Sequence, residues 1–247
     1  MLRSRIVPFL LLSGNGLVKT QKFGSPKYVG DPINAVKIFN EKEVDELTLL
    51  DIDATTSGRG PNMSLLKNIA AESRMPLCYG GGVKDAETAA EIIALGFEKV
   101  SVSHAALERV GLVGEMAERV GRQSVVVTID ITREGLLGGG YKVYSQNARL
   151  RHKVDPIRFA QRCSEIGAGE IVINSIDRDG MTAGYDMHFA RKLRAAITTP
   201  MTVVGGAGSI GDLRSLTSEL GPIGAGAGSM FVFKGKYRAV LISYTRP

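Results

Sequence analysis

The chain has 247 residues, 44% of them hydrophobic and 23% charged, with a net charge of +6 at pH 7. This length suits one (β/α)8 barrel, which typically needs about 250 residues, so we expect a single domain over residues 1–247. No apolar run approaches the roughly 20 residues of a membrane span, and the 31 Lys and Arg residues form no basic run, which argues against membrane insertion and nucleic-acid binding.

Eight short apolar runs, most of them rich in Val, Ile and Leu, alternate with amphipathic segments. The first run follows a basic start like that of a secretory signal, but Pro8 interrupts it and no small-residue cleavage site follows. Such runs predict parallel strands buried on both faces, near residues 5–11, 47–52, 76–80, 99–103, 124–130, 170–176, 200–205 and 223–228. Helices are expected within 31–43, 85–96, 155–167 and 186–197, several opening with a capping Asp. Eight βα units favour a closed TIM barrel over an open sheet.

The two halves of the chain resemble each other. LLDIDAT around Asp51 echoes NSIDRDG around Asp177, YGGGVKD echoes VGGAGSIGD, and VSVSHAA around Ser103 echoes AGAGSMF around Ser229. The spacing between these pairs is nearly constant. We therefore expect a two-fold half-barrel repeat, with matching chemistry on opposite sides of the barrel mouth.

Two long segments interrupt the regular pattern. Residues 13–30 follow the first strand and are polar and Gly-rich, so they could close over a ligand as a mobile loop. Lys19 within them could contact a phosphate or a reaction intermediate, although an exposed, solvated lysine is the commoner outcome. Residues 133–153 follow the fifth strand and contain a predicted β-ribbon at 141–146.

Glycine clusters follow the third and seventh strands. Small residues there let backbone N–H groups approach an anion, and hydroxyl groups from the ends of the fourth and eighth strands could complete the two cradles. The alternative is that the glycines merely permit tight turns. Because the clusters repeat across one barrel mouth, we favour a ligand with two phosphates. The residues concerned are Gly80, Gly81, Gly82 and Ser103, and Gly205, Gly206, Gly208 and Ser229.

Carboxylates also gather at the carboxyl ends of strands. Asp51 ends the second strand, Asp130 the fifth, and Asp177 and Asp179 follow the sixth. Such groups can transfer protons or orient substrate hydroxyls, or they can hold loops through backbone or Arg partners such as Arg178. Aligning residues 6–11 with 125–130 places Leu11 opposite Asp130, where symmetry leads us to expect a second carboxylate.

Four charged residues stand at the opposite ends of the strands: Arg5, Glu46, Lys99 and Glu170. They should converge on the bottom mouth as a salt-bridged ring. Residues on that face usually serve stability, so a structural cluster is the simpler interpretation.

The remaining reactive side chains give no further site. Neither His104, His152 nor His188 stands in a metal-binding spacing, and we expect no metal or cofactor. Cys78 and Cys163 are too few for a disulfide framework, so we expect reduced core thiols in a cytoplasmic protein.

Several motifs together resemble the cyclase subunit of imidazole glycerol phosphate synthase, HisF, over nearly the whole chain. They are RIVPFLLL, GDPINAVKIFNEKEVDELTLLDIDAT, YGGGV, KVSVSHAAL, GAGEIVINSIDRDGMTAGYD and GGAGS. The resemblance implies a HisH-like glutaminase at the barrel bottom and ammonia passage to a phosphorylated substrate at the top. It assigns the ammonia gate to Arg5, Glu46, Lys99 and Glu170, phosphate binding to Gly82, Ser103, Asp179, Gly180, Gly206, Gly228 and Ser229, and the mobile-loop lysine to Lys19.

The chain departs from this family at two places. Its catalytic pair would be an Asp at position 11 with Asp130, but Leu11 cannot exchange protons, so cyclisation is in question. Ser103 and His104 also replace an Asn-Thr pair in one phosphate site.

The segments FLLLSGNGLVKT and SMFVFKGKYRAVLISY resemble a HisF-like branch associated with surface-polysaccharide genes. This implies ammonia delivery to a separate sugar amidotransferase that converts an acetamido group into an acetamidino group. The alternatives are a genuine cyclase of histidine biosynthesis and a non-catalytic scaffold that activates a glutaminase.

Overall fold

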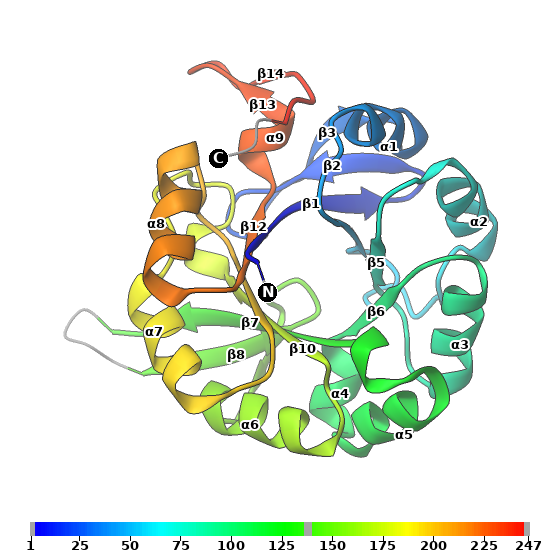
Figure 1. The fold of residues 1–247 in the computed structure, drawn as a ribbon, viewed down its shortest axis with the longest axis vertical. Coiled ribbons are helices and arrows are strands. Elements are labelled where there is room, and N and C mark those ends of the chain that lie inside the picture. The colour runs from blue at the N-terminus through cyan, green and yellow to red at the C-terminus, as the bar shows by residue number, and fades with distance from the viewer. Residues whose placement is uncertain (1–2, 136–139, 245–247) are drawn as a thin grey trace.

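The computed structural model describes residues 3–135 and 140–244 and shows a closed (β/α)8 barrel (Figure 1). Parallel pairing runs through successive barrel strands from β1 to β12, and β12 pairs with β1 with Arg5 beside Gly224. The barrel strands are β1 (Arg5–Ser13), β4 (Leu47–Asp51), β5 (Leu77–Gly80), β6 (Lys99–Val102), β7 (Val125–Arg133), β10 (Glu170–Ser175), β11 (Met201–Val204) and β12 (Gly224–Ala227). The expected fold and strand positions are therefore confirmed.

Helices cover the outside of the barrel (Figure 1). They are α1 (Pro32–Glu41), α2 (Met63–Glu72), α3 (Ala86–Ala94), α4 (His104–Glu108), α5 (Gly111–Val120), α6 (Pro156–Ile166), α7 (Met187–Ala196), α8 (Ile210–Leu220) and α9 (Ser229–Val232), with 3-10 turns η1 (Arg122–Ser124) and η2 (Ile176–Arg178). The four helices expected to begin after an Asp do so, because each Asp side chain accepts a hydrogen bond from a first-turn amide. No helix in the described ranges is long and apolar enough to cross a membrane.

The segment after the first strand contains two short strands. Strand β2 (Gly16–Lys19) pairs antiparallel with β1, and β3 (Lys27–Gly30) pairs with β2. Part of the segment 13–30 therefore forms a hairpin where the sequence indicated a loop, with Leu17, Lys19 and Val29 buried. Its movement over a ligand stays a prediction. The predicted ribbon after the fifth strand is confirmed as β8 (Tyr141–Ser145), which pairs with β9 (Leu150–His152). Near the C-terminal end, β13 (Phe233–Lys234) pairs with β14 (Ala239–Val240).

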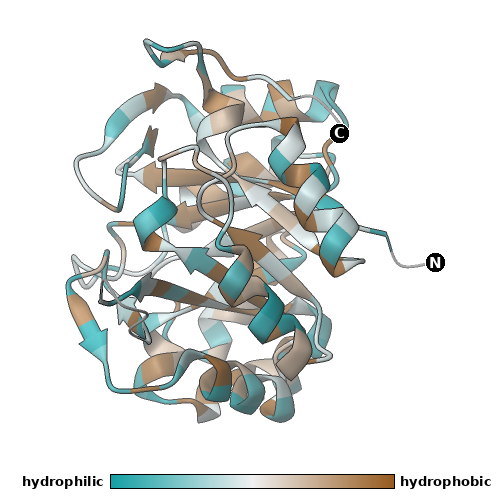
Figure 2. Cartoon of the chain, turned by 90° about the vertical axis from the view of Figure 1, so that its left-hand side faces the viewer, coloured by the Kyte–Doolittle hydropathy of each residue, from teal (hydrophilic) through white to brown (hydrophobic). Residues whose placement is uncertain are grey.

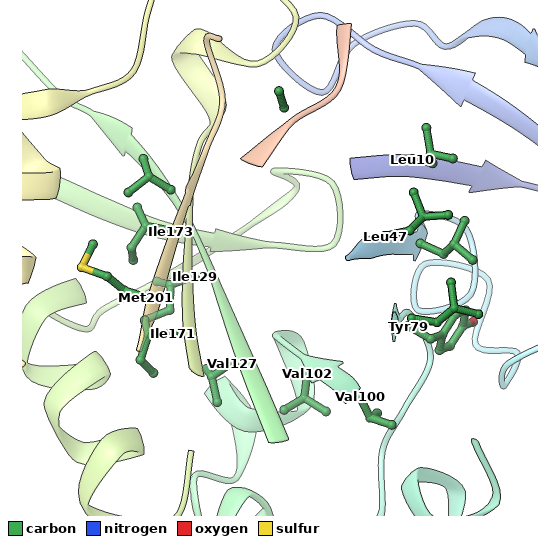
Figure 3. Packing of buried hydrophobic residues seen from close by; sticks show 14 of the residues in the cluster. Leu10, Leu47, Tyr79, Val100, Val102, Val127, Ile129, Ile171, Ile173 and Met201 are labelled. Carbon is green, nitrogen blue, oxygen red and sulfur yellow. The ribbon is translucent and has the colours of Figure 1, made fainter. Parts of the chain in front are cut away.

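The core forms two layers separated by the barrel wall. Outward strand residues such as Leu10, Tyr79 and Ile173 pack beneath the helices (Figure 3). An inner cluster fills the barrel itself, from Val7, Phe9, Cys78, Val126, Val172 and Val204. Charged and polar residues lie on the outer helix surfaces, with apolar segments inside (Figure 2). Cys78 and Cys163 are buried free thiols, as expected.

The half-barrel repeat is visible in the elements, with one correction to its register. Strand β6 ends at Val102 and α4 begins at His104, whereas β12 ends at Ala227 and α9 begins at Ser229. Ser103 therefore corresponds to Gly228, and His104 to Ser229, one residue away from the pairing that the sequence motifs indicated. The sequence alignment paired Ser103 with Ser229 because both are serines. Residue identity alone does not show where each strand ends.

Candidate functional site

A pocket of about 560 Å³ opens at the carboxyl ends of the barrel strands. Most of the residues that the sequence assigned to the top of the barrel line it, although Gly208 and Asp177 do not. The lining residues among them include Lys19, Asp51, Gly82, Ser103, Asp130, Asp179, Gly180, Gly206, Gly228 and Ser229. Leu11 lines the same pocket. Pockets of this size hold small-molecule ligands, and their position at the barrel top is where enzymes of this fold act.

Asp130 is the carboxylate best placed for proton transfer. Its Oδ1 accepts a hydrogen bond from Asn174 Nδ2 at 3.0 Å. Desolvation deep in the barrel raises the pKa of Asp130 to about 7; the Asn174 hydrogen bond opposes this shift, and the charge of Asp179 adds to it. A carboxyl group whose pKa lies near neutral pH can both donate and accept a proton under physiological conditions.

The opposite wall lacks that chemistry. Asp130 on β7 stands beside Asn174 on β10, whereas Leu11 on β1 stands beside Leu50 on β4. Both leucines line the pocket. Leu11 therefore forms an apolar pair with Leu50. The sequence did not indicate this pair, because a leucine such as Leu50 is ordinary within a buried strand.

Asp51 and Asp179 are held by cations. Arg59 donates to both oxygens of Asp51, at 2.9 and 2.8 Å. Lys19 lies 2.5 Å from Asp179 and is buried, so the common outcome of a solvated lysine does not apply. The alternative that Asp51 holds a loop is supported, although its partner is Arg59; Arg178 instead donates to the backbone oxygens of Ala183 and Gly184.

Asp177, which the sequence grouped with these carboxylates, lies outside the residues that line the pocket. It accepts hydrogen bonds from the Thr132 hydroxyl at 2.6 Å and the Arg133 amide at 2.7 Å. It therefore ties the end of β7 to the segment after β10.

The glycines have a packing role of their own. Gly206 has a φ of 109°, and a Cβ there would collide with the carbonyl oxygen of Gly184. Gly82, with a φ of 70°, would bring a Cβ to 2.8 Å from the carbonyl oxygen of Arg59. These contacts make glycine necessary whether or not an anion binds.

Two serine hydroxyls carry the stronger indication of a ligand. The buried Oγ atoms of Ser103 and Ser229 have no hydrogen-bond partner within the described chain. A buried polar atom without a partner is costly, at about 1–3 kcal/mol, so such atoms usually meet a ligand or water. Because both line the pocket from opposite half-barrels, they suit two oxyanion groups.

The four charged residues at the other end form a closed ring. Lys99 Nζ lies 2.7 Å from Glu46 and 2.8 Å from Glu170, and Arg5 pairs with Glu46 and, at 2.7 Å, with Glu170. Thr202, which the sequence analysis missed, donates to Glu170 at 2.5 Å. Burial would lower the pKa of Lys99, but the charges of Glu170 and Glu46 outweigh it and raise the pKa. Lys99 therefore stays charged at neutral pH.

Glu170 makes the stability of the fold sensitive to acid. Burial would raise its pKa, but Lys99 and Arg5 outweigh burial and hold the pKa at about 2, below the ordinary 4.5. Its contribution is present above pH 4.5 and is lost as the pH falls towards 2. We expect the free energy of unfolding to fall by roughly 3 kcal/mol over this window, measured by urea titration, and less steeply in Glu170→Gln. An equal acid slope in both proteins would contradict this.

A small cavity lies between the ring and the pocket. A cavity of about 10 Å³ is lined by Glu46 and Glu170, and its walls also include Phe9, Ser101 and Thr128. These last three residues line the top pocket too. A void of roughly 10–15 Å³ holds one water-sized molecule, so the barrel interior has room for a small neutral molecule between ring and pocket.

One group of side chains could bind a metal, contrary to the expectation from sequence spacing. Ligand atoms of His104, Glu108 and His152 lie within 4.8 Å of one another. However, Ser145 Oγ already bonds His104 Nδ1 at 3.1 Å and His152 Nε2 at 2.8 Å. Sequence reasoning missed this cluster because the β8–β9 ribbon brings together histidines that are far apart in the chain.

Comparison with known proteins shows a consistent similarity. Residues 5–238 match the family described as "Histidine biosynthesis protein". A Vibrio vulnificus protein named "Putative imidazole glycerol phosphate synthase subunit hisF3" is 53% identical over 247 residues, which cover 100% of this chain and 95% of that protein. A Pseudomonas aeruginosa protein with the corresponding name hisF2 is 51% identical, over 99% of this chain and 96% of its own length. The Leifsonia xyli imidazole glycerol phosphate synthase subunit HisF is 36% identical, over 84% and 82%.

Proposed function

Since this chain belongs to the histidine biosynthesis protein family, we propose that it is a HisF-like subunit that receives ammonia from a HisH-like glutaminase and passes it to the top pocket. The carrying observation is the closed ring of Arg5, Glu46, Lys99 and Glu170 beneath a cavity that shares walls with the pocket. The ring is the gate of this path. A purely structural ring needs no such space above it.

The acceptor is proposed to be an acetamido sugar of surface-polysaccharide biosynthesis, reached through a separate sugar amidotransferase. Leu11 and Leu50 support this, because they remove one proton-exchanging wall that cyclisation would use. The similarities do not separate this acceptor from that of a cyclase. The proteins named hisF2 and hisF3, 51–53% identical to this chain, and the Leifsonia HisF, 36% identical, all carry the name of an imidazole glycerol phosphate synthase subunit.

Reconstitution tests this proposal directly. The chain, a HisH-like glutaminase, a sugar amidotransferase and an acetamido sugar nucleotide are combined with glutamine, and the amidino product is detected by mass spectrometry. Product should require this chain when glutamine is the nitrogen source and should form without it when ammonium is supplied in excess. Glutamine-dependent product in the absence of this chain would contradict the proposal.

A genuine cyclase is the second candidate, and Asp130 is the observation that favours it. Its pKa of about 7 is suited to acid–base catalysis in the pocket. The cyclase would combine ammonia with the ribulosyl bisphosphate substrate of the histidine pathway. Both candidates use the same gate, and they differ in whether bisphosphate turnover occurs.

The two serine hydroxyls give a prediction common to both candidates. We expect Ser103→Ala and Ser229→Ala each to weaken binding of a phosphorylated ligand by about 10- to 100-fold, since a hydrogen bond to a charged group contributes about 1.5–3 kcal/mol. The free energy of unfolding should change by less than about 0.5 kcal/mol, because neither hydroxyl has a partner within the described chain. Calorimetric titration and urea unfolding measure the two quantities. A stability loss without weaker binding would assign these hydroxyls to the fold.

A further inference from the structure

Arg149 differs from the other cations that line the pocket. Three of those cations interact with a carboxylate: Lys19 with Asp179, Arg59 with Asp51, and Lys84 with Asp85. Within residues 3–135 and 140–244, by contrast, the exposed side chain of Arg149 has no hydrogen bond and no ion pair. Arg149 therefore gives the pocket a positive charge that no carboxylate of the described chain neutralises.

The turn that carries Arg149 joins β8 to β9 and reaches across part of the barrel mouth. Asn147 Nδ2 on this turn donates to the backbone oxygen of Ile52, which follows β4, at 2.8 Å. Strands β5 and β6 lie between β4 and β7 in the barrel. The turn therefore spans the ends of the two strands that lead into Gly82 and Ser103, the residues of one proposed phosphate cradle.

The backbone of this turn is strained. Gln146, Asn147 and Ala148 have φ values of 54°, 57° and 63°. This left-handed conformation is disfavoured for residues that carry a Cβ, so three in succession need surrounding contacts to hold them. The hydrogen bond from Asn147 Nδ2, and the approach of Gln146 Nε2 to His104 Nε2 at 3.1 Å, are such contacts. They fix the backbone from which Arg149 projects, and strain of this kind is common where a segment positions a ligand-binding group.

The half-barrel repeat supplies a counterpart for Arg149. The hairpin after β1 and the ribbon after β7 each add an antiparallel strand to a nine-residue barrel strand. In the first, Lys19 lies against Gly228, where an added Cβ would come within 2.9 Å of Lys19 Cε. In the second, Gln146 approaches His104, the first residue of α4. Each hairpin therefore lies over the cradle of the neighbouring barrel strand and brings a cation to the pocket, Lys19 in one half and Arg149 in the other.

We propose that Arg149 binds the oxyanion held by Ser103, and that this half of the pocket is the stronger phosphate site. The proposal rests on the phosphorylated ligand of the proposed function and adds a residue that sets its orientation. At the opposite cradle, Asp179 neutralises Lys19, so a phosphate gains less from that cation. At Ser103 a phosphate meets a hydroxyl without a partner in the described chain and a guanidinium that can donate two parallel hydrogen bonds to its oxygens. The more highly charged end of a ligand therefore binds at Ser103.

Inorganic phosphate is the probe, and each cradle is measured after the hydroxyl of the other is removed. Ser229→Ala leaves the Ser103 cradle intact, and Ser103→Ala leaves the Ser229 cradle intact. We expect Arg149→Met to weaken phosphate binding by about three- to tenfold in the Ser229→Ala chain, since an exposed guanidinium contributes less than a buried one. In the Ser103→Ala chain the loss should stay below about 1.5-fold, because the two changes affect one site. Titration calorimetry at low ionic strength measures these affinities.

Arg151→Met is the matched control, because it removes the same charge from the same ribbon. Arg151 is exposed, pairs with Glu134 at 3.4 Å and lies outside the residues that line the pocket. Its replacement should leave phosphate affinity unchanged. Arg149→Lys should recover part of the affinity that Arg149→Met loses, since lysine keeps the charge but not the planar fork. Urea unfolding of Arg149→Met should match wild type, because the side chain has no partner in the described residues.

The outcomes separate this inference from the proposed function. An equal loss of affinity in both serine backgrounds, or in Arg151→Met, would assign the effect to overall charge and overturn the role of Arg149. An unchanged affinity in the Ser229→Ala background would overturn it too. The isolated full chain is used, so a failure of ammonia transfer would leave a positive result standing. A wild-type chain that binds no phosphate would contradict both this inference and the phosphorylated ligand on which it rests.

Discussion

Leu11→Asp is expected to increase turnover of the ribulosyl bisphosphate substrate, measured at high ammonium concentration, by about 10²- to 10⁴-fold over the wild-type chain. The reason is geometric. Leu11 lines the pocket that also holds Asp130, so a carboxylate at position 11 would face the same ligand from the first strand. An acid and a base on two walls can then act in one reaction.

The neighbouring leucine sharpens this experiment. Asp130 is paired with Asn174, so Leu11→Asp combined with Leu50→Asn recreates that polar pair on β1 and β4. Leu11→Asn is the matched control, since it has the size and polarity of the aspartate but exchanges no proton. Robust wild-type turnover would favour the cyclase and contradict a loss of function at position 11; rescue by the Asn variant would show that polarity alone matters.

Lys99→Met is expected to uncouple glutamine hydrolysis from the pocket. Without Lys99, the cation that Glu46 and Glu170 keep within the described chain is Arg5, so the ring cannot close in its present form. We expect glutamine-driven transfer to fall by about tenfold or more, equivalent to about 1.4 kcal/mol, while the ammonium-driven reaction persists. Product formed per glutamate released is the quantity to measure.

This change also removes one partner of a buried ion pair, which can cost about 3–5 kcal/mol of stability. Assays should therefore be run below the unfolding transition of the variant. Lys37→Met is the matched control, because the ion pair of Lys37 in the described residues is an exposed contact of 3.8 Å with Glu72. Equal losses with glutamine and with ammonium would show that Lys99 supports the fold and not the passage of ammonia.

The sequence predicted those features that local signals specify. Strand positions follow from short apolar runs, and Asp31, Asp85, Asp155 and Asp186 mark helix starts because a carboxylate that bonds first-turn amides is a local device. The bottom ring was predicted because parallel strands begin at one end of the barrel. Position in a strand is therefore sufficient to bring Arg5 and Lys99 together.

The features that the sequence did not predict depend on contacts between distant segments. Burial of Lys19 requires the β2–β3 hairpin to lay it on Asp179, 160 residues away in the chain. Asn174 and Leu50 occupy equivalent inward positions on their strands. Their roles could not be predicted from the sequence, because they depend on the neighbouring residues Asp130 and Leu11. The histidine cluster likewise exists only because the β8–β9 ribbon folds back onto α4.

The difference between the two walls of the pocket affects the orientation in which a ligand can bind. A barrel with two equivalent oxyanion cradles would accept a ligand carrying a phosphate at each end in either of two orientations. Here one wall is Leu11 with Leu50 and the other is Asp130 with Asn174, while His104 stands at one cradle where the other has Ser229. The two binding orientations that the repeat would make equivalent are therefore expected to differ in affinity. We therefore expect the pocket to distinguish the two ends of such a ligand although the scaffold is nearly symmetric.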